Sequence, residues 1–202
     1  MMLSRYNIYF LFILSICFAF TALAQKQKMA SPKSGSIYTQ VYSKYTQACK
    51  DVDMNTVSEG EDVPQLCKAY GGYWLYRTSA VYRVSLAIQD ASRKFSVPVV
   101  AAEDENAKAL ENGCVKKFGD KIEWLVEDGK PFAFVVRVSY YKDTNNEQTV
   151  FNPRNKAGEF LFVRGLKDYQ ALQYEVSVTG TAYNPNEQAR MLAYRFYEEH
   201  QK

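Results

Sequence analysis

Few side chains in this sequence could do chemistry. Its one histidine, His200, is the third residue from the end of the chain. A Ser-His-Asp or Cys-His mechanism needs its histidine base held within hydrogen-bond reach of the nucleophile, and residues at a chain end are poorly held. Zinc sites need clustered cysteine and histidine residues, and the sequence has no such cluster. We therefore expect neither kind of site, and no cofactor.

Paired carboxylates are the remaining route to catalysis. Glu123, Glu159 and Glu175 lie on or beside expected strands. Glycoside hydrolysis needs two carboxyl groups about 5–10 Å apart across a cleft, and no feature of the sequence pairs any two of these three. A small carboxylate-based hydrolase acting on cell-wall material is therefore an alternative function, and whether the protein is an enzyme at all stays open.

The most distinctive local string is Tyr70-Gly71-Gly72-Tyr73-Trp74. Two glycines between aromatic residues indicate either a tight bend or a backbone that another group approaches closely. The string is not a phosphate-binding loop, because no Lys-Ser/Thr follows the glycines. One interpretation is a turn or bulge beside a disulfide. The other is a rim of Tyr70, Tyr73 and Trp74 that docks a partner protein or a glycan.

The start of the chain indicates its compartment. Arg5 precedes an apolar run from Ile8 to Phe20, and the segment closes on Ala22-Leu23-Ala24. This is the pattern of a secretory signal peptide over residues 1–24, cut before Gln25. An uncleaved anchor is the alternative, although a bilayer span needs about 20 apolar residues and this run is marginal. We expect cleavage, no membrane span afterwards, and a periplasmic or secreted protein.

The remaining chain has the size of one domain. We expect a flexible leader over residues 25–35, where lysine, serine and proline gather, and a single globular domain over residues 36–202. The whole chain has 25 basic and 22 acidic residues, a net charge of +3, and the two signs are interspersed. It lacks the basic patch that nucleic-acid binding requires, so no nucleic-acid partner is expected.

Cysteine usage follows from the compartment. Cys17 leaves with the signal peptide, and two of the three remaining cysteines should pair in an oxidising environment. We predict the pair Cys49–Cys67, because these residues bracket an acidic, turn-rich segment with little apolar content. Closing a loop of this size contributes about 3 kcal/mol. Cys114 is then unpaired, and we interpret it as a small buried apolar residue rather than an intermolecular bridge or a nucleophile.

Alternation of apolar and polar residues predicts strands along most of the chain. The expected strands cover residues 37–45, 73–77, 81–88, 97–100, 121–126, 131–141, 160–163 and 172–178, with a helix as the alternative for 37–45 and a weak helix over 103–112. Asp128-Gly129 predicts a two-residue type I′ hairpin turn. Positions whose numbers sum to 257 would then face each other, so that Trp124 would face Ala133 and Asp120 would face Arg137. We expect a structural ion pair between Asp120 and Arg137, since a buried guanidinium needs a partner.

The last segment has a helical period. Asn184 can cap a helix and Pro185 suits its first position. Ala189, Leu192, Ala193 and Phe196 then form one apolar stripe. The fold class that follows is α+β: a mostly antiparallel β-sheet, as a sandwich or curved sheet, with one C-terminal amphipathic helix packed on it.

Several strings together resemble an uncharacterised family of secreted bacterial proteins, and the likeness spans most of the expected mature chain. They are Cys67-Lys68-Ala69-Tyr70-Gly71-Gly72-Tyr73, Lys121-Ile122-Glu123-Trp124, Gly129-Lys130-Pro131-Phe132-Ala133 with Arg137, and Asn186-Glu187-Gln188-Ala189-Arg190. The resemblance implies a bacterial envelope origin and supports the Cys49–Cys67 pair. It carries no known activity and no catalytic residue.

The sequence therefore favours a secreted or periplasmic, non-enzymatic binding or accessory module. An inhibitor, or a partner of an envelope protein or glycan, would fit this description. The carboxylate-based hydrolase and a purely structural envelope protein are the alternatives.

Overall fold

The computed structural model describes residues 39–44, 49–52, 64–80, 83–180 and 183–201, all within the compact unit Pro32–Lys202. The predicted signal peptide, its cleavage site, Cys17 and the predicted leader lie outside the described residues. None of the described helices is long and apolar enough to cross a membrane.

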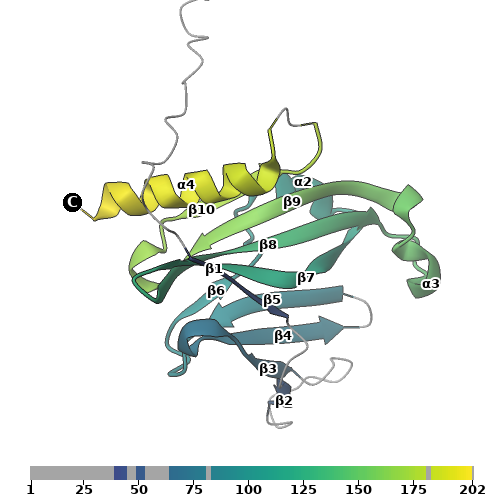
Figure 1. Cartoon of the computed structure of the whole chain (residues 1–202). Helices are drawn as coiled ribbons and strands as arrows, with labels where there is room; N and C mark the ends of the chain where they lie inside the picture. The colour runs from purple at the N-terminus through teal and green to yellow at the C-terminus, as the bar shows by residue number, and fades with distance from the viewer. Residues whose placement is uncertain (1–38, 45–48, 53–63, 81–82, 181–182, 202) are drawn as a thin grey trace, which may run out of the picture. The chain divides into compact units, whose positions relative to one another are not determined.

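The described chain forms two antiparallel sheets of five strands each (Figure 1). The first sheet has the order β1 (Thr39–Lys44), β7 (Cys114–Glu127), β8 (Lys130–Lys142), β9 (Lys156–Gly165) and β10 (Gln173–Ser177). The second has the order β2 (Cys49–Asp51), β3 (Gln65–Lys68), β4 (Trp74–Ala80), β5 (Arg83–Gln89) and β6 (Ser96–Pro98). Between strands lie α2 (Glu105–Glu111), α3 (Glu147–Val150) and the 3₁₀ turns η2 (Tyr70–Gly72), η3 (Pro153–Asn155) and η4 (Lys167–Tyr169), and the chain ends in α4 (Pro185–His200).

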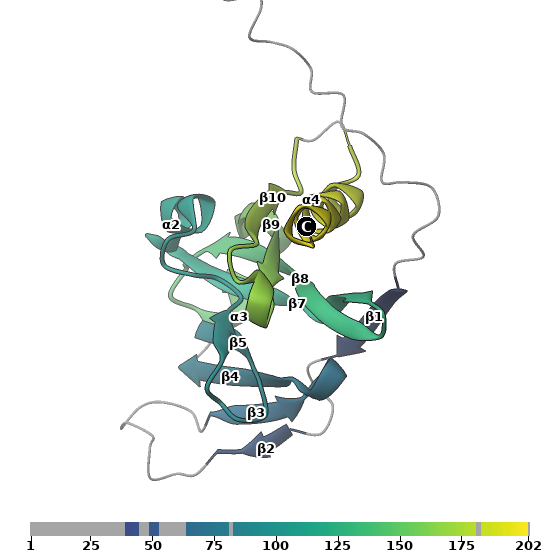
Figure 2. The same cartoon turned by 90° about the vertical axis from the view of Figure 1, so that its left-hand side faces the viewer.

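The two larger apolar cores of the described residues arise because successive side chains of a strand point to opposite faces, and a small third cluster joins Val115, Tyr141 and Val150. One core joins the two sheets and includes Leu75 and Ile88 of the second sheet with Trp124 and Phe134 of the first. The other core packs α4 on the opposite face of the first sheet. Figure 2 looks along α4 and shows the first sheet below the helix and the second sheet below the first. The predicted α+β class, with its mostly antiparallel sheet and terminal helix, is confirmed.

Helix α4 begins as its sequence predicts. The Asn184 side chain accepts a hydrogen bond from the Asn186 backbone N–H at 3.0 Å, and Pro185 occupies the first turn. Ala189 and Ala193 are fully buried against the sheet. The cap therefore fixes where the helix starts, and the small residues of the stripe let it lie close to the strands.

The β7–β8 hairpin has the predicted turn but not the predicted register. Asp128 (φ 47°) and Gly129 (φ 73°) both have positive φ, as a type I′ turn requires. An irregularity between Leu125 and Val126 shifts the pairing by one residue, so that Trp124 lies opposite Phe134 instead of Ala133. A bulge of this kind inserts an unpaired residue, which a pattern of alternation does not reveal.

Candidate functional site

The predicted rim of Tyr70, Tyr73 and Trp74 does not form one surface. Tyr73 is buried, with 6% of its surface exposed, and its ring stacks on Trp124 with 6.0 Å between centroids. Tyr70 also packs against the core between the sheets. Trp74 follows Tyr73 in the chain and therefore points to the opposite face, where it lines a separate hollow of about 400 Å³.

The glycines of this string explain why the bend occurs here. Gly71 has φ 63° and Gly72 has φ 82°, a region that side chains rarely adopt. A Cβ atom built on Gly71 would lie 2.5 Å from Cγ of Pro131. Both readings of the glycines thus hold: the backbone bends tightly, and the β7–β8 hairpin approaches it closely. This contact brings η2 of the second sheet against the tip of a hairpin of the first.

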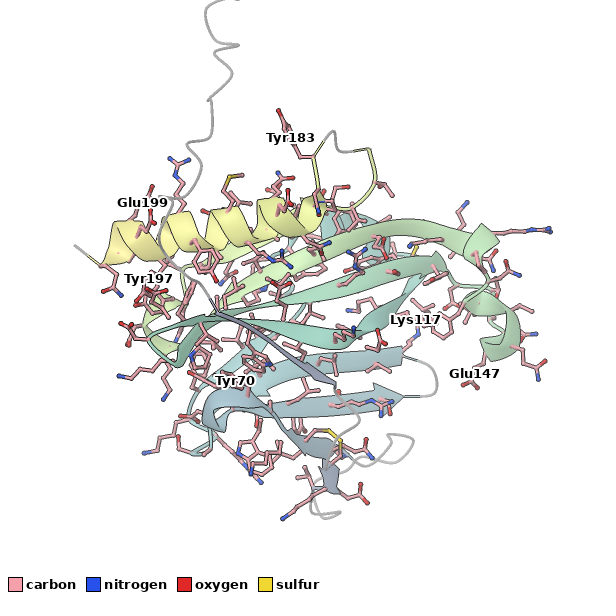
Figure 3. All side chains as sticks on the ribbon, in the orientation of Figure 1. Tyr70, Lys117, Glu147, Tyr183, Tyr197 and Glu199 are labelled. Carbon is pink, nitrogen blue, oxygen red and sulfur yellow. A yellow bond between two sulfur atoms is a disulfide. The ribbon has the colours of Figure 1, made fainter. Side chains whose placement is uncertain are left out.

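A cavity of about 430 Å³ opens beside that contact, and we call it the hairpin cavity. Four segments that are distant in sequence provide its walls: η2, the β7–β8 turn, the loop from Leu166 to Tyr169, and the C-terminal end of α4. Figure 3 labels Tyr197 near this end of α4. The lining residues are Gly71, Tyr73, Glu127, Asp128, Lys130, Pro131, Phe132, Leu166, Lys167, Asp168, Tyr169, Tyr197 and Gln201.

Backbone hydrogen bonds fix the loop wall of the hairpin cavity. The Leu166 N–H donates to the Phe132 carbonyl at 2.8 Å, and the Gly165 N–H donates to the Leu172 carbonyl at 2.8 Å. A Cβ atom built on Gly165 would lie 1.7 Å from the Tyr169 carbonyl oxygen, so only glycine fits at this turn. The cavity is therefore preformed by backbone contacts rather than by side chains alone.

Four aromatic residues belong to the cavity wall: Phe132 (3% exposed) and Tyr73 (6% exposed) are buried, and Tyr169 and Tyr197 are half-buried. The rings of Phe132 and Tyr197 lie 4.5 Å apart between centroids, and those of Tyr169 and Tyr197 lie 5.2 Å apart. The Gln201 side-chain amide donates to the Tyr169 hydroxyl at 2.7 Å. These contacts hold α4 against the loop and leave part of the Tyr169 and Tyr197 side chains exposed.

Burial and nearby carboxylates together raise the pKa values of three cavity residues. Burial, together with the charges of Asp90 and Asp168, raises the pKa of Tyr73 to about 12. Burial first, then Tyr169 and the charge of Glu127, raises the pKa of Tyr197 to about 12. Burial and the neighbouring charges of Asp128 and Glu198 raise the pKa of Glu127. In each case a nearby carboxylate adds to the effect of burial.

Two non-glycine residues of the cavity have left-handed backbone. Asp128 has φ 47° as part of the hairpin turn, and Lys167 has φ 42° at the start of η4. No hairpin turn accounts for the positive φ of Lys167. Its ammonium lies 5.8 Å from the centroid of the Tyr73 ring. Such backbone costs about 1–3 kcal/mol, and it occurs outside the cavity too, at Arg93 and Asn145.

The three glutamates considered for hydrolysis are held apart. Glu123 and Glu159 lie on the α4 side of the first sheet, opposite Val135 and Ser139 of β8. Val135 and Ser139 are four residues apart along β8, which corresponds to about 13 Å. Glu175 lies opposite Phe162 and faces the other side of the sheet.

Each of the first two glutamates is bound by arginine. Arg190 of α4 donates from Nε to Glu123 at 2.5 Å. Glu159 pairs with Arg137 at 3.3 Å and with Lys156 at 3.0 Å. Burial raises the pKa of Glu159, but the hydrogen bonds and positive charges around it outweigh burial, so the net effect lowers it. A lowered pKa does not suit a general acid.

Arg137 therefore has other partners than the predicted Asp120. Its guanidinium binds Glu159 and donates to the Asn186 side-chain oxygen at 3.1 Å. A register irregularity between Phe118 and Ile122 takes Asp120 out of the β7–β8 pairing, and its side chain is exposed. The predicted pairing assumed a regular hairpin, which the bulge interrupts.

Sequence reasoning missed a buried ion pair between Arg164 and Asp104. Arg164 is 1% exposed and Asp104 is 5% exposed. The Asp104 carboxylate also accepts the Ala101 N–H at 2.6 Å. A signal was present, because Arg164 shares the strand face of Phe160 and Phe162, which are both in the core between the sheets. A cation on an apolar face needs a buried partner.

The cysteine prediction is confirmed for the disulfide. Cys49 and Cys67 are bonded between the paired strands β2 and β3. Cys114 is a free thiol, half-buried against the core between the sheets. Burial raises the pKa of Cys114, and the charge of Lys142 only partly opposes this effect. A thiolate nucleophile is therefore not favoured at Cys114.

His200 and a metal site are the remaining candidates. The exposed ring of His200 stacks on Phe196, with 3.8 Å between centroids, and its Nδ1 lies 2.8 Å from the Phe196 carbonyl oxygen. Within the described ranges, no three His, Cys, Asp or Glu side chains are placed to hold a metal ion. We take the hairpin cavity, where residues from four separate segments meet, as the candidate site.

Comparison with protein-family models, with curated proteins and with solved structures finds no match for this chain.

Proposed function

We propose that this protein is an exported, non-enzymatic binding module that holds its ligand in the hairpin cavity. One observation carries the proposal: a preformed cavity of about 430 Å³ is lined by aromatic rings together with both carboxylates and ammonium groups. Concave, largely preformed sites with a few convergent polar groups are where small ligands bind. The Cys49–Cys67 disulfide supports export, because such bonds persist in oxidising compartments.

The geometry gives less support to the hydrolase alternative. Glu123 and Glu159 are each engaged by arginine, and Glu175 faces the other side of the sheet. A retaining or inverting mechanism needs two carboxyl groups facing one another across the scissile bond. Binding without turnover is therefore the function that these contacts favour.

The test is a nuclear magnetic resonance titration of the ¹⁵N-labelled protein, expressed with its predicted signal peptide and purified from the exported fraction. The probes are N,N′-diacetylchitobiose, trialanine, 1,5-diaminopentane and inorganic phosphate. The amides of Gly71 and Gly129 report on the hairpin cavity, and those of Gly113 and Gly180 serve as distant controls. We expect saturable shifts at the first pair alone with at least one probe.

Two results would contradict the proposal. If all four probes leave Gly71 and Gly129 unmoved, the cavity is not a binding site of this kind. If mass spectrometry shows chitobiose or trialanine being cleaved, the protein is an enzyme. The mass of the purified chain also tests export, since a start at Gln25 is expected and a start at Met1 contradicts it.

A further inference from the structure

Resting on the proposed binding function, we propose that the hairpin cavity receives an alkylammonium group, meaning a primary amine on an aliphatic stem. Either a free diamine or the lysine side chain of a peptide would supply this chemistry. Three independent features of the cavity support the proposal: its rings, its carboxylates and the position of Lys167.

The half-buried rings of Tyr169 and Tyr197 provide surface for an organic cation. Their centroids lie 5.2 Å apart, and both rings pack on Phe132, which is itself buried, at 5.8 and 4.5 Å. An ammonium over such faces is attracted by the ring quadrupole, by about 0.5–1 kcal/mol at exposed sites and more when it loses water. The aliphatic stem of the ligand would pack against the same rings.

The charges favour a cation over an anion. The ionisable lining comprises three carboxylates, Glu127, Asp128 and Asp168, and two ammonium groups, Lys130 and Lys167. Three negative and two positive charges leave a formal charge of −1 on the lining. Burial is the main cause of the raised pKa values of Tyr73, Tyr197 and Glu127, and neighbouring carboxylates add to it in each case.

Lys167 already places an ammonium group at the aromatic wall. Its Nζ lies 5.8 Å from the Tyr73 ring centroid, and its backbone is held at φ 42°. The side chain is of the same chemical class as the proposed ligand. The ligand would therefore compete with Lys167, and removing the Lys167 ammonium should strengthen binding.

The experiment titrates the same exported protein with 1,5-diaminopentane and with 1,5-pentanediol, its neutral counterpart of equal length. We expect saturable amide shifts at Gly71 and Gly129 with the diamine only. Asp168→Asn should weaken the diamine about tenfold or more. Lys167→Ala should tighten it several-fold. Tyr169→Leu, which keeps apolar bulk but loses the ring face, should weaken it.

Lys117→Ala is the matched control. Lys117 lies over the Phe151 ring at 5.5 Å, and Figure 3 places it at the opposite end of the first sheet from Tyr197. The variant removes the same type of contact without touching the hairpin cavity. Its affinity for the diamine should equal that of the unaltered protein.

The source of the ammonium is distinguished with a peptide. Acetyl-Gly-Lys-Gly-amide is compared with the same peptide carrying norleucine in place of lysine. Binding of the lysine peptide tighter than the diamine assigns the site to a protein partner, and the reverse assigns it to a free amine.

Two outcomes overturn the inference. One is equal response to the diamine and the diol, which would show recognition of the alkyl stem alone. The other is a diamine response that Asp168→Asn and Lys167→Ala both leave unchanged. If the diamine fails while chitobiose, trialanine or phosphate shifts Gly71 and Gly129, this inference is wrong and the proposed binding function stands. If every probe fails, both are wrong.

Discussion

Gly71 lies directly against Pro131, and this contact joins η2 of the second sheet to the hairpin tip of the first. It also forms part of the wall of the hairpin cavity. The close approach explains why a glycine rather than another turn-forming residue is found at position 71.

We expect Gly71→Ala to be clearly more destabilising than Gly72→Ala. Both residues have positive φ, which costs an L-residue about 1–2 kcal/mol. Only at Gly71 would the added methyl group also meet a neighbour, since nothing lies within 4 Å of a Cβ atom on Gly72. Urea unfolding measures both variants, and equal losses of free energy of unfolding would contradict the role given to Pro131.

The cysteines give a second prediction. Under denaturing, non-reducing conditions, the exported protein should show one alkylatable thiol, Cys114, and three after reduction. Replacing both Cys49 and Cys67 with alanine should lower the free energy of unfolding by about 3 kcal/mol, since the residues are 18 apart in sequence. Mass spectrometry counts the alkylated thiols. Three reactive thiols before reduction would argue against the disulfide and against export.

The Arg164–Asp104 pair gives a third prediction. Asp104→Asn preserves the shape of the side chain but leaves the Arg164 guanidinium buried without its counter-charge. We expect a loss of about 3–5 kcal/mol in the free energy of unfolding.

Glu199→Gln is the control for that measurement. It removes the exposed i,i+4 pair with Arg195, whose atoms lie 3.0 Å apart, and should change stability by about 0.5 kcal/mol or less. Urea unfolding at neutral pH compares the two variants. Equal effects would mean that the buried pair contributes no more than a surface pair.

The pH dependence of stability gives a fourth prediction, with opposite signs at two glutamates. Burial and the charge of Asp104 raise the pKa of Glu175 above its ordinary 4.5. Its contribution to stability is therefore complete below about pH 4.5 and is lost as pH rises through the raised pKa. The pKa of Glu159 is lowered from 4.5, so its contribution is present above about pH 4.5 and is lost as pH falls through the lower pKa.

Thermal unfolding from pH 3 to pH 8 tests both signs. Relative to the unaltered protein, Glu175→Gln should gain stability as pH rises above about 4.5. Glu159→Gln should be less stable at neutral pH and should approach the unaltered protein in acid. Parallel curves for either variant would contradict the shift assigned to that residue.

Much of the fold could be predicted from local patterns. Asp128-Gly129 predicted the hairpin turn, and Asn184-Pro185 predicted the start of α4. The β8 strand, apolar on both faces, occupies the centre of its sheet. These features depend on backbone preferences and on a two- or 3.6-residue period, both of which are written in neighbouring residues.

The site could not be predicted in the same way. The register of β7 and β8 depends on two irregularities, and a shift of one residue moves every facing pair. Arg137 consequently pairs with Glu159 rather than Asp120. Tyr73 and Trp74, adjacent in sequence, are separated by the sheet.

By itself, then, the sequence determined the α+β class, the terminal helix and the choice of Cys49 and Cys67 as the bonded pair, because each depends on local patterning or on the composition of one loop. Only the tertiary structure decided which aromatic and charged side chains meet. The hairpin cavity collects Tyr73, Glu127, Lys167 and Tyr197 from four separate segments. Their proximity results from sheet packing and from the Gly71–Pro131 contact, and no spacing along the chain encodes it.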